Sequence, residues 1–391
     1  MTNTFIDIGI DSQSKWGQKV CGDTLIAKYI PEQGRVVAIL SDGLGSGIKA
    51  SVLSTLTASM ALKYLENNLD IVKAASVIMR TLPLCQIRQI SYATFSIIDI
   101  ASDLTVNIVE YDTPSLLFFS NNEFAPIERK TVDVANFNRP AVLHLSKITA
   151  SKNDRIIFHT DGLNQSGLGK RGTPYGWGTD GIKEFLRSLV LKFPHMSARA
   201  MAKQLVNQAN VYDGWQCGDD TTCGVIYFRD PRPLLITTGP PIQQSSDSLL
   251  AQQFRGFKGT KVICGDTTAK ILARELNLKI TLDVRRGNND IPPLAHMDGT
   301  ELVTEGMVTL NKAFEYLSAK QLPVFSHDNA ALSLANTLLD HDEIRFLIGT
   351  KINDANITLN NASVETRYTI VKKLAHLLEE RYLKRVSLQI I

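Results

Sequence analysis

The most restrictive feature of this sequence is a change in the order of predicted strands and helices near residues 229–233. Before that point, short β-type runs such as "RVVAIL" and "YATFSIIDI" follow one another with few helices between them. After it, predicted strands alternate regularly with predicted helices. The first pattern is typical of antiparallel layers, and the second of a parallel sheet with helices on both faces. We therefore predict an α+β chain of two domains, 1–229 and 230–391.

The alternation in the second domain is regular enough to give approximate bounds. The predicted strands are 234–239, 260–265, 279–284, 301–306, 344–350 and 385–391, and the predicted helices are 246–256, 267–277, 308–320, 329–340 and 364–382. This order predicts a Rossmann-like α/β domain with a mostly parallel sheet. In the first domain the clearest predicted helices are 48–66 and 198–210, and the apolar residues of the former, including Val52 and Leu56, are expected to pack in the core.

Composition excludes several classes of protein. The 42 basic and 39 acidic residues are spread along the chain, so no basic stripe suggests a nucleic-acid partner. No run approaches the roughly 18 apolar residues of a membrane span, and the first residues do not resemble a secretion signal. The five cysteines include no C-x-x-C pair, which favours reduced thiols. We expect a cytoplasmic protein that binds neither nucleic acid nor membrane.

Acidic residues stand at the ends of several predicted strands. Asp42 follows "RVVAIL", Asp161 follows "RIIFHT", and the pair Asp219 and Asp220 precedes "CGVIYF". Carboxylates gathered in one place repel one another, and a divalent cation removes that conflict. Since neither histidine nor cysteine accompanies the acids in a ligand-like pattern, the expected metal is magnesium or manganese rather than zinc.

These segments also carry a family resemblance. "SDGLGSGIKAS", "NDRIIFHTDGLNQSG" and "GDDTTCGVIYF", in that order, resemble the metal-dependent (PPM) serine/threonine protein phosphatases, in particular the branch of stage II sporulation protein E. "KVCGD", "YATFSIIDI" and "YGWGTDGIKEFL" fall where that branch has comparable segments. The resemblance covers about residues 1–228. It implies an antiparallel β-sandwich of the PPM type, flanked by helices.

The resemblance also implies a site for two Mn²⁺ or Mg²⁺ ions. Asp42 would bridge the metals and the Gly43 carbonyl would be a further ligand, while Asp161 and Asp219 would hold the same ions from the other side. Asp42, Asp161 and Asp219 would thus be the catalytic residues. Asp23 matches a family acid at or near the site, and Asp220 matches a neighbour of the ligands.

The implied activity is hydrolysis of phosphoserine or phosphothreonine by a metal-activated water. The implied substrate is a phosphorylated regulatory protein, such as an anti-sigma factor antagonist. The stretch "VEYDTPSLLFF" departs from the family pattern and offers Asp112 as a further acid at the rim, and Lys49 is a candidate phosphate clamp.

Two other functions fit parts of the sequence. The first is an inactive scaffold or sensor with a vestigial metal site, although the acids are all present. The second is a nucleotide-binding oxidoreductase with its cofactor in the C-terminal domain. For "SDGLGSG" itself, dinucleotide binding needs an acid at a second strand end about 20 residues later, and residues 62–69 read instead as the end of a helix.

The C-terminal domain offers its own candidate site. In doubly wound sheets, ligands bind beyond the carboxyl ends of the strands, and here those ends carry Gly265, Thr267, Thr268, Thr304 and Lys351. Thr267 and Thr268 open a predicted helix, whose free N–H groups favour an anion. We expect a small anionic ligand there, through which the domain would regulate the phosphatase, or else ordinary helix caps without a ligand.

Overall fold

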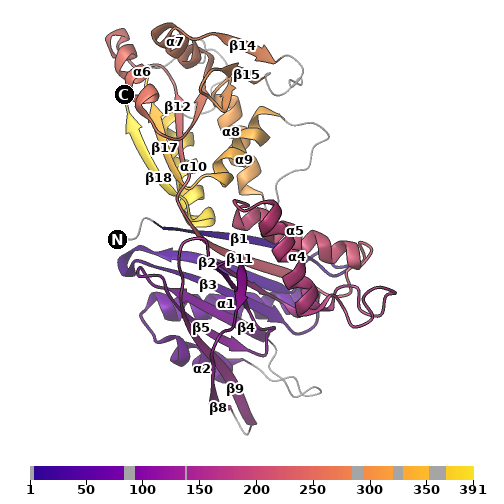
Figure 1. Ribbon diagram of the computed structural model, residues 1–391. Coiled ribbons are helices and arrows are strands. Elements are labelled where there is room, and N and C mark those ends of the chain that lie inside the picture. Colours follow the sequence, from indigo (N-terminus) through magenta and orange to yellow (C-terminus); the bar gives the residue numbers. More distant parts are fainter. Residues whose placement is uncertain (1–3, 83–92, 137–138, 284–293, 320–328, 352–366) are drawn as a thin grey trace. The chain divides into compact units, whose positions relative to one another are not determined.

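The computed structural model describes residues 4–82, 93–136, 139–283, 294–319, 329–351 and 367–391 (Figure 1). Contacts between residues divide the chain into two compact units, Met1–Asp230 and Pro231–Ile391. They are referred to below as the N-terminal unit and the C-terminal unit, and each is described by itself. In the described part of the chain, no helix is both long and apolar enough to cross a membrane.

Two antiparallel sheets form the centre of the N-terminal unit. The first has the order β1-β11-β10-β6-β7, and the second has the order β2-β3-β4-β5-β9-β8. The strands of the first sheet are β1 (Phe5–Gln13), β6 (Leu117–Ser120), β7 (Glu123–Ala125), β10 (Arg155–His159) and β11 (Thr221–Arg229). Those of the second are β2 (Asp23–Ile30), β3 (Arg35–Gly43), β4 (Ala93–Ile100), β5 (Thr105–Tyr111), β8 (Arg129–Asn136) and β9 (Arg139–Thr149).

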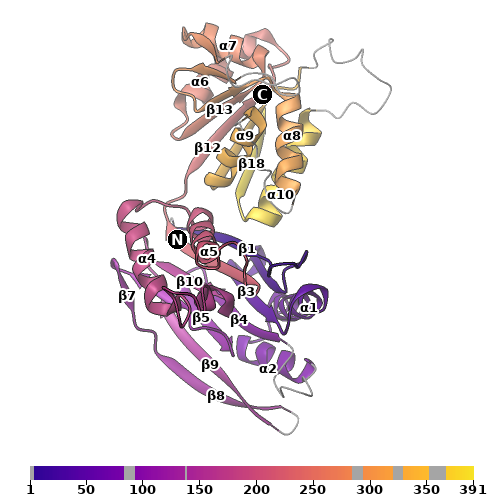
Figure 2. The same cartoon turned by 90° about the vertical axis from the view of Figure 1, so that its right-hand side faces the viewer.

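The two sheets pack face to face and carry helices on their outer faces. Along β3, Ala38 and Leu40 join a core shared with Phe158 of the first sheet, whereas Val37 and Ile39 join a core on the other face. That outer face is covered by α1 (Gly47–Glu66) and α2 (Ile71–Thr81), and the outer face of the first sheet by α4 (Gly178–Lys192) and α5 (Ala198–Tyr212) (Figure 2). The predicted antiparallel sandwich flanked by helices is therefore confirmed.

Helix α1 packs only in part through the predicted face, because Leu65 is buried in the core but the larger apolar residues of its first half are not. Val52 and Leu56 were expected in the core, but they are 60% and 47% exposed. Small residues such as Ala50 and Ala61 are buried instead. The helix lies very close to β3, since a Cβ added at Gly43 would stand 2.1 Å from the Ala50 carbonyl oxygen. At such a close approach only small side chains fit between the start of the helix and the strand, so Val52 and Leu56 are exposed while Leu65, near the end of the helix, is buried.

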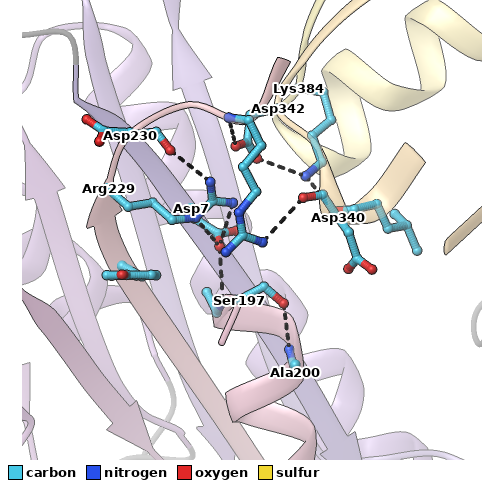
Figure 3. A network of polar contacts seen from close by, with 12 residues as sticks. Asp7, Ser197, Ala200, Arg229, Asp230, Asp340, Asp342 and Lys384 are labelled. Atoms are coloured by element: carbon cyan, nitrogen blue, oxygen red, sulfur yellow. Dashed lines mark hydrogen bonds and ion pairs between the residues drawn. The ribbon is translucent and has the colours of Figure 1, made fainter. Parts of the chain in front are cut away.

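A buried ion pair joins β1, β11 and the start of α5 (Figure 3). Asp7 Oδ2 accepts a hydrogen bond from Arg229 Nε at 3.0 Å and another from the Ala198 N–H at 3.0 Å. Ser197 caps the same helix by accepting a hydrogen bond from the Ala200 N–H. Removing either charge would leave the other buried without a partner, so the pair fixes β1 beside β11.

The C-terminal unit contains one sheet in the order β14-β15-β16-β13-β12-β17-β18. Its strands are β12 (Pro233–Thr238), β13 (Thr260–Cys264), β14 (Ile280–Asp283), β15 (Leu294–Met297), β16 (Leu302–Thr304), β17 (Glu343–Ile348) and β18 (Arg385–Ile390). β16, β13, β12, β17 and β18 are parallel, and β14 and β15 are antiparallel additions at one edge. The predicted mostly parallel sheet is confirmed. Chain order reverses between β12 and β17.

Helices cover both faces of this sheet (Figure 2). α6 (Asp247–Gly256) and α7 (Asp266–Leu276) pack on one face, and α8 (Met307–Ser318), α9 (Ala330–Asp340) and α10 (Arg367–Tyr382) pack on the other. The unit is thus a Rossmann-like α/β domain, as predicted.

The amino ends of its strands are tied together by one buried acid (Figure 3). Asp342, just before β17, accepts hydrogen bonds from the Arg232 N–H at 2.8 Å and from Lys384 Nζ at 3.4 Å. Its carbonyl oxygen accepts a further bond from the Arg385 N–H at 2.8 Å. The starts of β12, β17 and β18 are therefore held by charged and backbone groups that satisfy one another.

Candidate metal centre

Two acids face each other at one end of the second sheet of the N-terminal unit. Asp23 begins β2, Asp42 lies next to the last residue of β3, and the two stand opposite each other in the antiparallel pair. Gly43, which ends β3, leaves the space that α1 occupies. Gly22 is similarly constrained, because a Cβ there would lie 2.8 Å from Asp220 Oδ2. Glycine beside each acid therefore lets other elements approach the site closely.

Three more acids come from the first sheet. β10 and β11 are antiparallel neighbours, so the residues that follow β10 lie beside those that precede β11. Asp161 opens the short helix α3 (Asp161–Gln165), while Asp219 and Asp220 come directly before β11. A Cβ on Gly162 would lie 2.2 Å from the Asp220 carbonyl oxygen, which shows how closely the two segments pack.

A buried threonine joins the two groups of acids. Thr160 Oγ1 donates a hydrogen bond to Asp23 Oδ2 at 2.8 Å and accepts one from the Thr222 N–H at 3.0 Å. Sequence reasoning did not identify this link. The available signal was the hydroxyl residue next to each predicted acid, in "HTDG" and "DDTT".

The carboxylates are close enough to affect one another's ionisation. Burial raises the pKa of Asp42 well above its usual range, and the charges of Asp23, Asp161, Asp219 and Asp220 raise it further. Burial also raises the pKa of Asp23, although hydrogen bonds from Thr160 and Thr222 oppose this. The pKa of Asp161 is raised by burial and by Asp219. Without a cation, ionisation of one acid of the site therefore disfavours ionisation of its neighbours.

One lysine lies at its edge. Lys15 Nζ is 3.9 Å from Asp219 Oδ1, a distance at which a half-exposed pair contributes little. The Lys15 backbone N–H donates to Asp220 Oδ1 at 2.9 Å, which orients that carboxylate.

The donor set fits a hard divalent cation. Asp23 Oδ1 and Asp220 Oδ2 are buried without a hydrogen-bond partner, and buried carboxylate oxygens of this kind are the ligands that Mg²⁺ and Mn²⁺ prefer. Within the described ranges, no three acidic, histidine or cysteine side chains already converge closely enough to hold an ion. Asp23, Asp42, Asp161, Asp219 and Asp220 are the side chains that would hold such an ion.

Two other residues singled out in the sequence are exposed. Asp112 is exposed after β5 with a φ of 51°, and Lys49 is exposed in the first turn of α1. His159 is buried, its Nδ1 is 2.9 Å from the Thr160 carbonyl oxygen, and burial lowers the pKa of its ring. It is a buried residue of the core.

The predicted residues of the C-terminal unit divide into two sets. Gly265, Thr268 and Thr304 lie together at the carboxyl ends of β13 and β16, where the Gly265 N–H donates to the Thr304 carbonyl oxygen at 2.8 Å. Thr267 and Lys351 are exposed.

The N-terminal unit is similar to known proteins. The family model for stage II sporulation protein E (SpoIIE) matches residues 32–229. The RsbU and RsbW domains of a Mycobacterium tuberculosis protein share 15% identity and a TM-score of 0.50, over 64% of this chain and 67% of that one. The PP2C phosphatase domain of SpoIIE from Bacillus subtilis, solved with a fragment of its regulatory domain, shares 19% sequence identity and a TM-score of 0.48. The match covers 58% of this chain and 64% of that one. No curated protein sequence matches the chain. Since the family model covers just over half of the 391 residues, the chain belongs to the SpoIIE family of PPM (PP2C-type) phosphatases.

Proposed function

We propose that this protein hydrolyses phosphoserine or phosphothreonine on a regulatory protein with the aid of two Mn²⁺ or Mg²⁺ ions. The observation that carries the proposal is the meeting of Asp42, Asp161 and Asp219 from two different sheets, next to buried carboxylate oxygens without partners. The chain belongs to a phosphatase family, and this supports phosphate ester hydrolysis as the reaction of the acid site.

The proposed roles follow from the position of each side chain. When bound, the metal ions supply an activated water and neutralise charge on the phosphoryl group. Asp42 lies among the other four acids, which suits a ligand shared between two ions, and the Gly43 carbonyl follows it at the end of β3. Asp161 and Asp219, beside the ends of β10 and β11, would hold the ions from the first sheet.

Asp23 and Asp220 complete the proposed site. Thr160 fixes one oxygen of Asp23 and leaves the other without a partner, so Asp23 can serve as a ligand. The Lys15 N–H fixes one oxygen of Asp220 in the same way. No side-chain nucleophile is needed for this chemistry.

The proposed substrate rests on resemblance alone. Relatives in the resembling branch act on small phosphorylated regulatory proteins, often anti-sigma factor antagonists, and the M. tuberculosis neighbour joins an RsbU domain to an RsbW domain. A phosphorylated regulatory protein is therefore the first substrate class to examine.

The deciding experiment is a metal-dependence assay. The purified full chain is treated with a chelator and then assayed with p-nitrophenyl phosphate and a phosphoserine peptide, with and without Mn²⁺ or Mg²⁺. We expect hydrolysis only with metal, and its loss in Asp42→Asn. Asp133→Asn, on the exposed side of β8, is the matched control. Absence of hydrolysis under every metal condition would favour the inactive scaffold.

A further inference from the structure

Buried polar atoms of the C-terminal unit that lack a partner gather at one edge of its sheet. In the described part of this unit, every buried side-chain nitrogen or oxygen without a hydrogen bond belongs to Thr237, Thr238, Thr268, Thr304, Thr309 or Arg367. All six residues lie at the carboxyl ends of the parallel strands or in the first turns of the helices that follow. An unsatisfied buried hydroxyl costs about 1–3 kcal/mol, so such a concentration in one place needs an explanation.

The threonines belong to the edge itself and are fully enclosed. Thr237 and Thr238 end β12, and Thr268 lies in the first turn of α7, where a Cβ added at Gly265 would stand 3.1 Å from its hydroxyl. Each is 0% exposed. Thr304, which ends β16, stands beside the Cys264 thiol, a weak hydrogen-bonding partner.

The loops at this edge come together where the strand order reverses. A Cβ at Gly239, after β12, would lie 2.4 Å from the Gly349 carbonyl oxygen after β17. The same Cβ would lie 2.5 Å from Arg367 Nη1, so the guanidinium stands directly over the Gly239 backbone. Arg367 Nη1 makes only a long bond of 3.4 Å to the Gly349 carbonyl oxygen, and its Nε makes none. The Nε–H and Nη1–H groups of Arg367 can therefore donate hydrogen bonds to a ligand.

Charge divides the edge into two ends. Arg367 places a cation at the β12 and β17 end. At the β13 and β16 end, Asp266 opens α7 and Glu305 caps α8 by accepting from the Val308 N–H at 3.1 Å. These acids occupy the helix N-termini, so an anion is disfavoured there. Glu305 lies within electrostatic reach of Arg367, so the two ends belong to one site.

We propose that this edge binds a ribose phosphate, as part of a mononucleotide or as a free sugar phosphate. The phosphate lies against Arg367 and the Gly239 backbone, while sugar hydroxyls donate to Glu305 or Asp266 and meet the hydroxyls of Thr238 and Thr304. A ligand of this kind matches a guanidinium at one end, carboxylates at the other and neutral hydroxyls between them. Its position at the reversal of strand order is where such sheets bind ligands.

The test is calorimetric titration of the full chain in EDTA, so that the N-terminal unit neither binds metal nor hydrolyses the ligands. The probes are AMP, ribose 5-phosphate, adenosine and inorganic phosphate. Ribose 5-phosphate and AMP are expected to bind, with adenosine and inorganic phosphate at least about tenfold weaker, because each lacks one of the recognised ends. Tighter binding of AMP than of ribose 5-phosphate identifies a nucleotide as the source, and equal binding identifies a sugar phosphate. Absence of binding, or inorganic phosphate binding as tightly as ribose 5-phosphate, overturns the proposal.

Two variants test the named contacts. Arg367→Ala should weaken ribose 5-phosphate binding at least about tenfold, whereas Arg385→Ala, which removes a positive charge at the amino end of β18, should leave it unchanged. If Arg367→Ala does not fold, Arg367→Lys keeps the charge and should still weaken binding, because lysine lacks the guanidinium fork. Unchanged affinity in the folded arginine variant contradicts the proposal.

Thr238→Val distinguishes a hydroxyl that binds ligand from one that only stabilises the fold, because melting temperature and ligand affinity should change in opposite directions. It removes a buried hydroxyl without a partner and adds a methyl group, so the ligand-free protein should melt at a higher temperature. The same variant should lose affinity for ribose 5-phosphate. A lower melting temperature would show that the hydroxyl is already satisfied, and would remove the main argument for the site.

Discussion

The candidate sites of the two units both contain buried polar atoms that lack partners, but these atoms differ in kind. In the N-terminal unit, the unpartnered oxygens of Asp23 and Asp220 belong to a group of carboxylates that raise one another's pKa. In the C-terminal unit they are neutral hydroxyls beside one guanidinium. Carboxylates in excess need a cation, whereas hydroxyls with a separated cation and acids suit a polar organic ligand. We infer from the comparison that the charge of the unsatisfied atoms, rather than their number, indicates the class of ligand to test at each site.

The largest expected effect lies in the carboxylate group. Asp42→Asn and Asp219→Asn should each lower metal-dependent hydrolysis of p-nitrophenyl phosphate by roughly a thousandfold or more, since each removes charge from a site whose catalysis is mainly electrostatic. Turnover is measured at saturating Mn²⁺, and circular dichroism checks the fold.

The control for this prediction is Asp133→Asn, which removes the same charge from an exposed strand position. It should retain wild-type turnover. Retention of more than about a tenth of the activity in either site variant would show that the residue is not an essential ligand.

The same Asp42 variant should be more stable than the wild type when metal is absent. Because the folded-state pKa of Asp42 is raised, the native protein binds more protons than the unfolded chain, and stability falls as pH rises above the usual aspartate range. Asparagine has no such dependence. We expect Asp42→Asn to raise the free energy of unfolding in EDTA by about 1–3 kcal/mol at neutral pH, and by less near pH 5.

Urea denaturation in EDTA at the two pH values measures this difference. Added Mn²⁺ should reverse the order, because the wild type then gains binding energy that the variant lacks. A variant less stable than the wild type in EDTA would mean that Asp42 is not repelled by its neighbours.

The two folds and the candidate acids could be predicted from the sequence where an acidic residue lies beside the end of a predicted strand or where strands and helices alternate regularly. The acids at Asp42, Asp161 and Asp219 stood out because each lies beside the end of a predicted strand, and the alternation of strands and helices after residue 230 predicted the second fold. The packing of the first half of α1 could not be predicted, since apolar periodicity does not reveal how closely Gly43 approaches Ala50. Similarly, Thr160 and Arg367 are ordinary residues in sequence, and only the fold brings them to Asp23 and Gly239.

Strands β8 and β9 also could not be identified from the sequence alone. Each alternates polar and apolar residues, as in "RKTVDVAN" at Arg129–Asn136, and neither stands out as an apolar run. Their pairing with each other and with β5 defines them, which is tertiary information that a local pattern does not contain.

A smaller effect is expected on phosphatase activity when a ligand binds the C-terminal unit. If the C-terminal unit regulates the phosphatase, saturating AMP should change the kcat/KM for p-nitrophenyl phosphate about fivefold or more, because coupling free energies are typically 1–3 kcal/mol. Arg367→Ala should remove the effect without changing basal activity. An effect that persists in Arg367→Ala would place AMP at the metal site instead, and binding without any effect would leave the C-terminal unit without a regulatory role.

The smallest expected effect concerns cysteine, and it separates the carboxylate site from a thiol enzyme. The described cysteines are all free, and Cys217 and Cys223 are buried, with burial raising the pKa of the Cys223 thiol. Since reactivity belongs to the thiolate and the proposed mechanism uses no side-chain nucleophile, iodoacetamide should leave Mn²⁺-dependent turnover unchanged. The treated protein is assayed with and without Mn²⁺ present during alkylation, and mass spectrometry reports which cysteines have reacted. Complete inactivation that Mn²⁺ prevents, with the fold intact, would mean that a thiol takes part in the site.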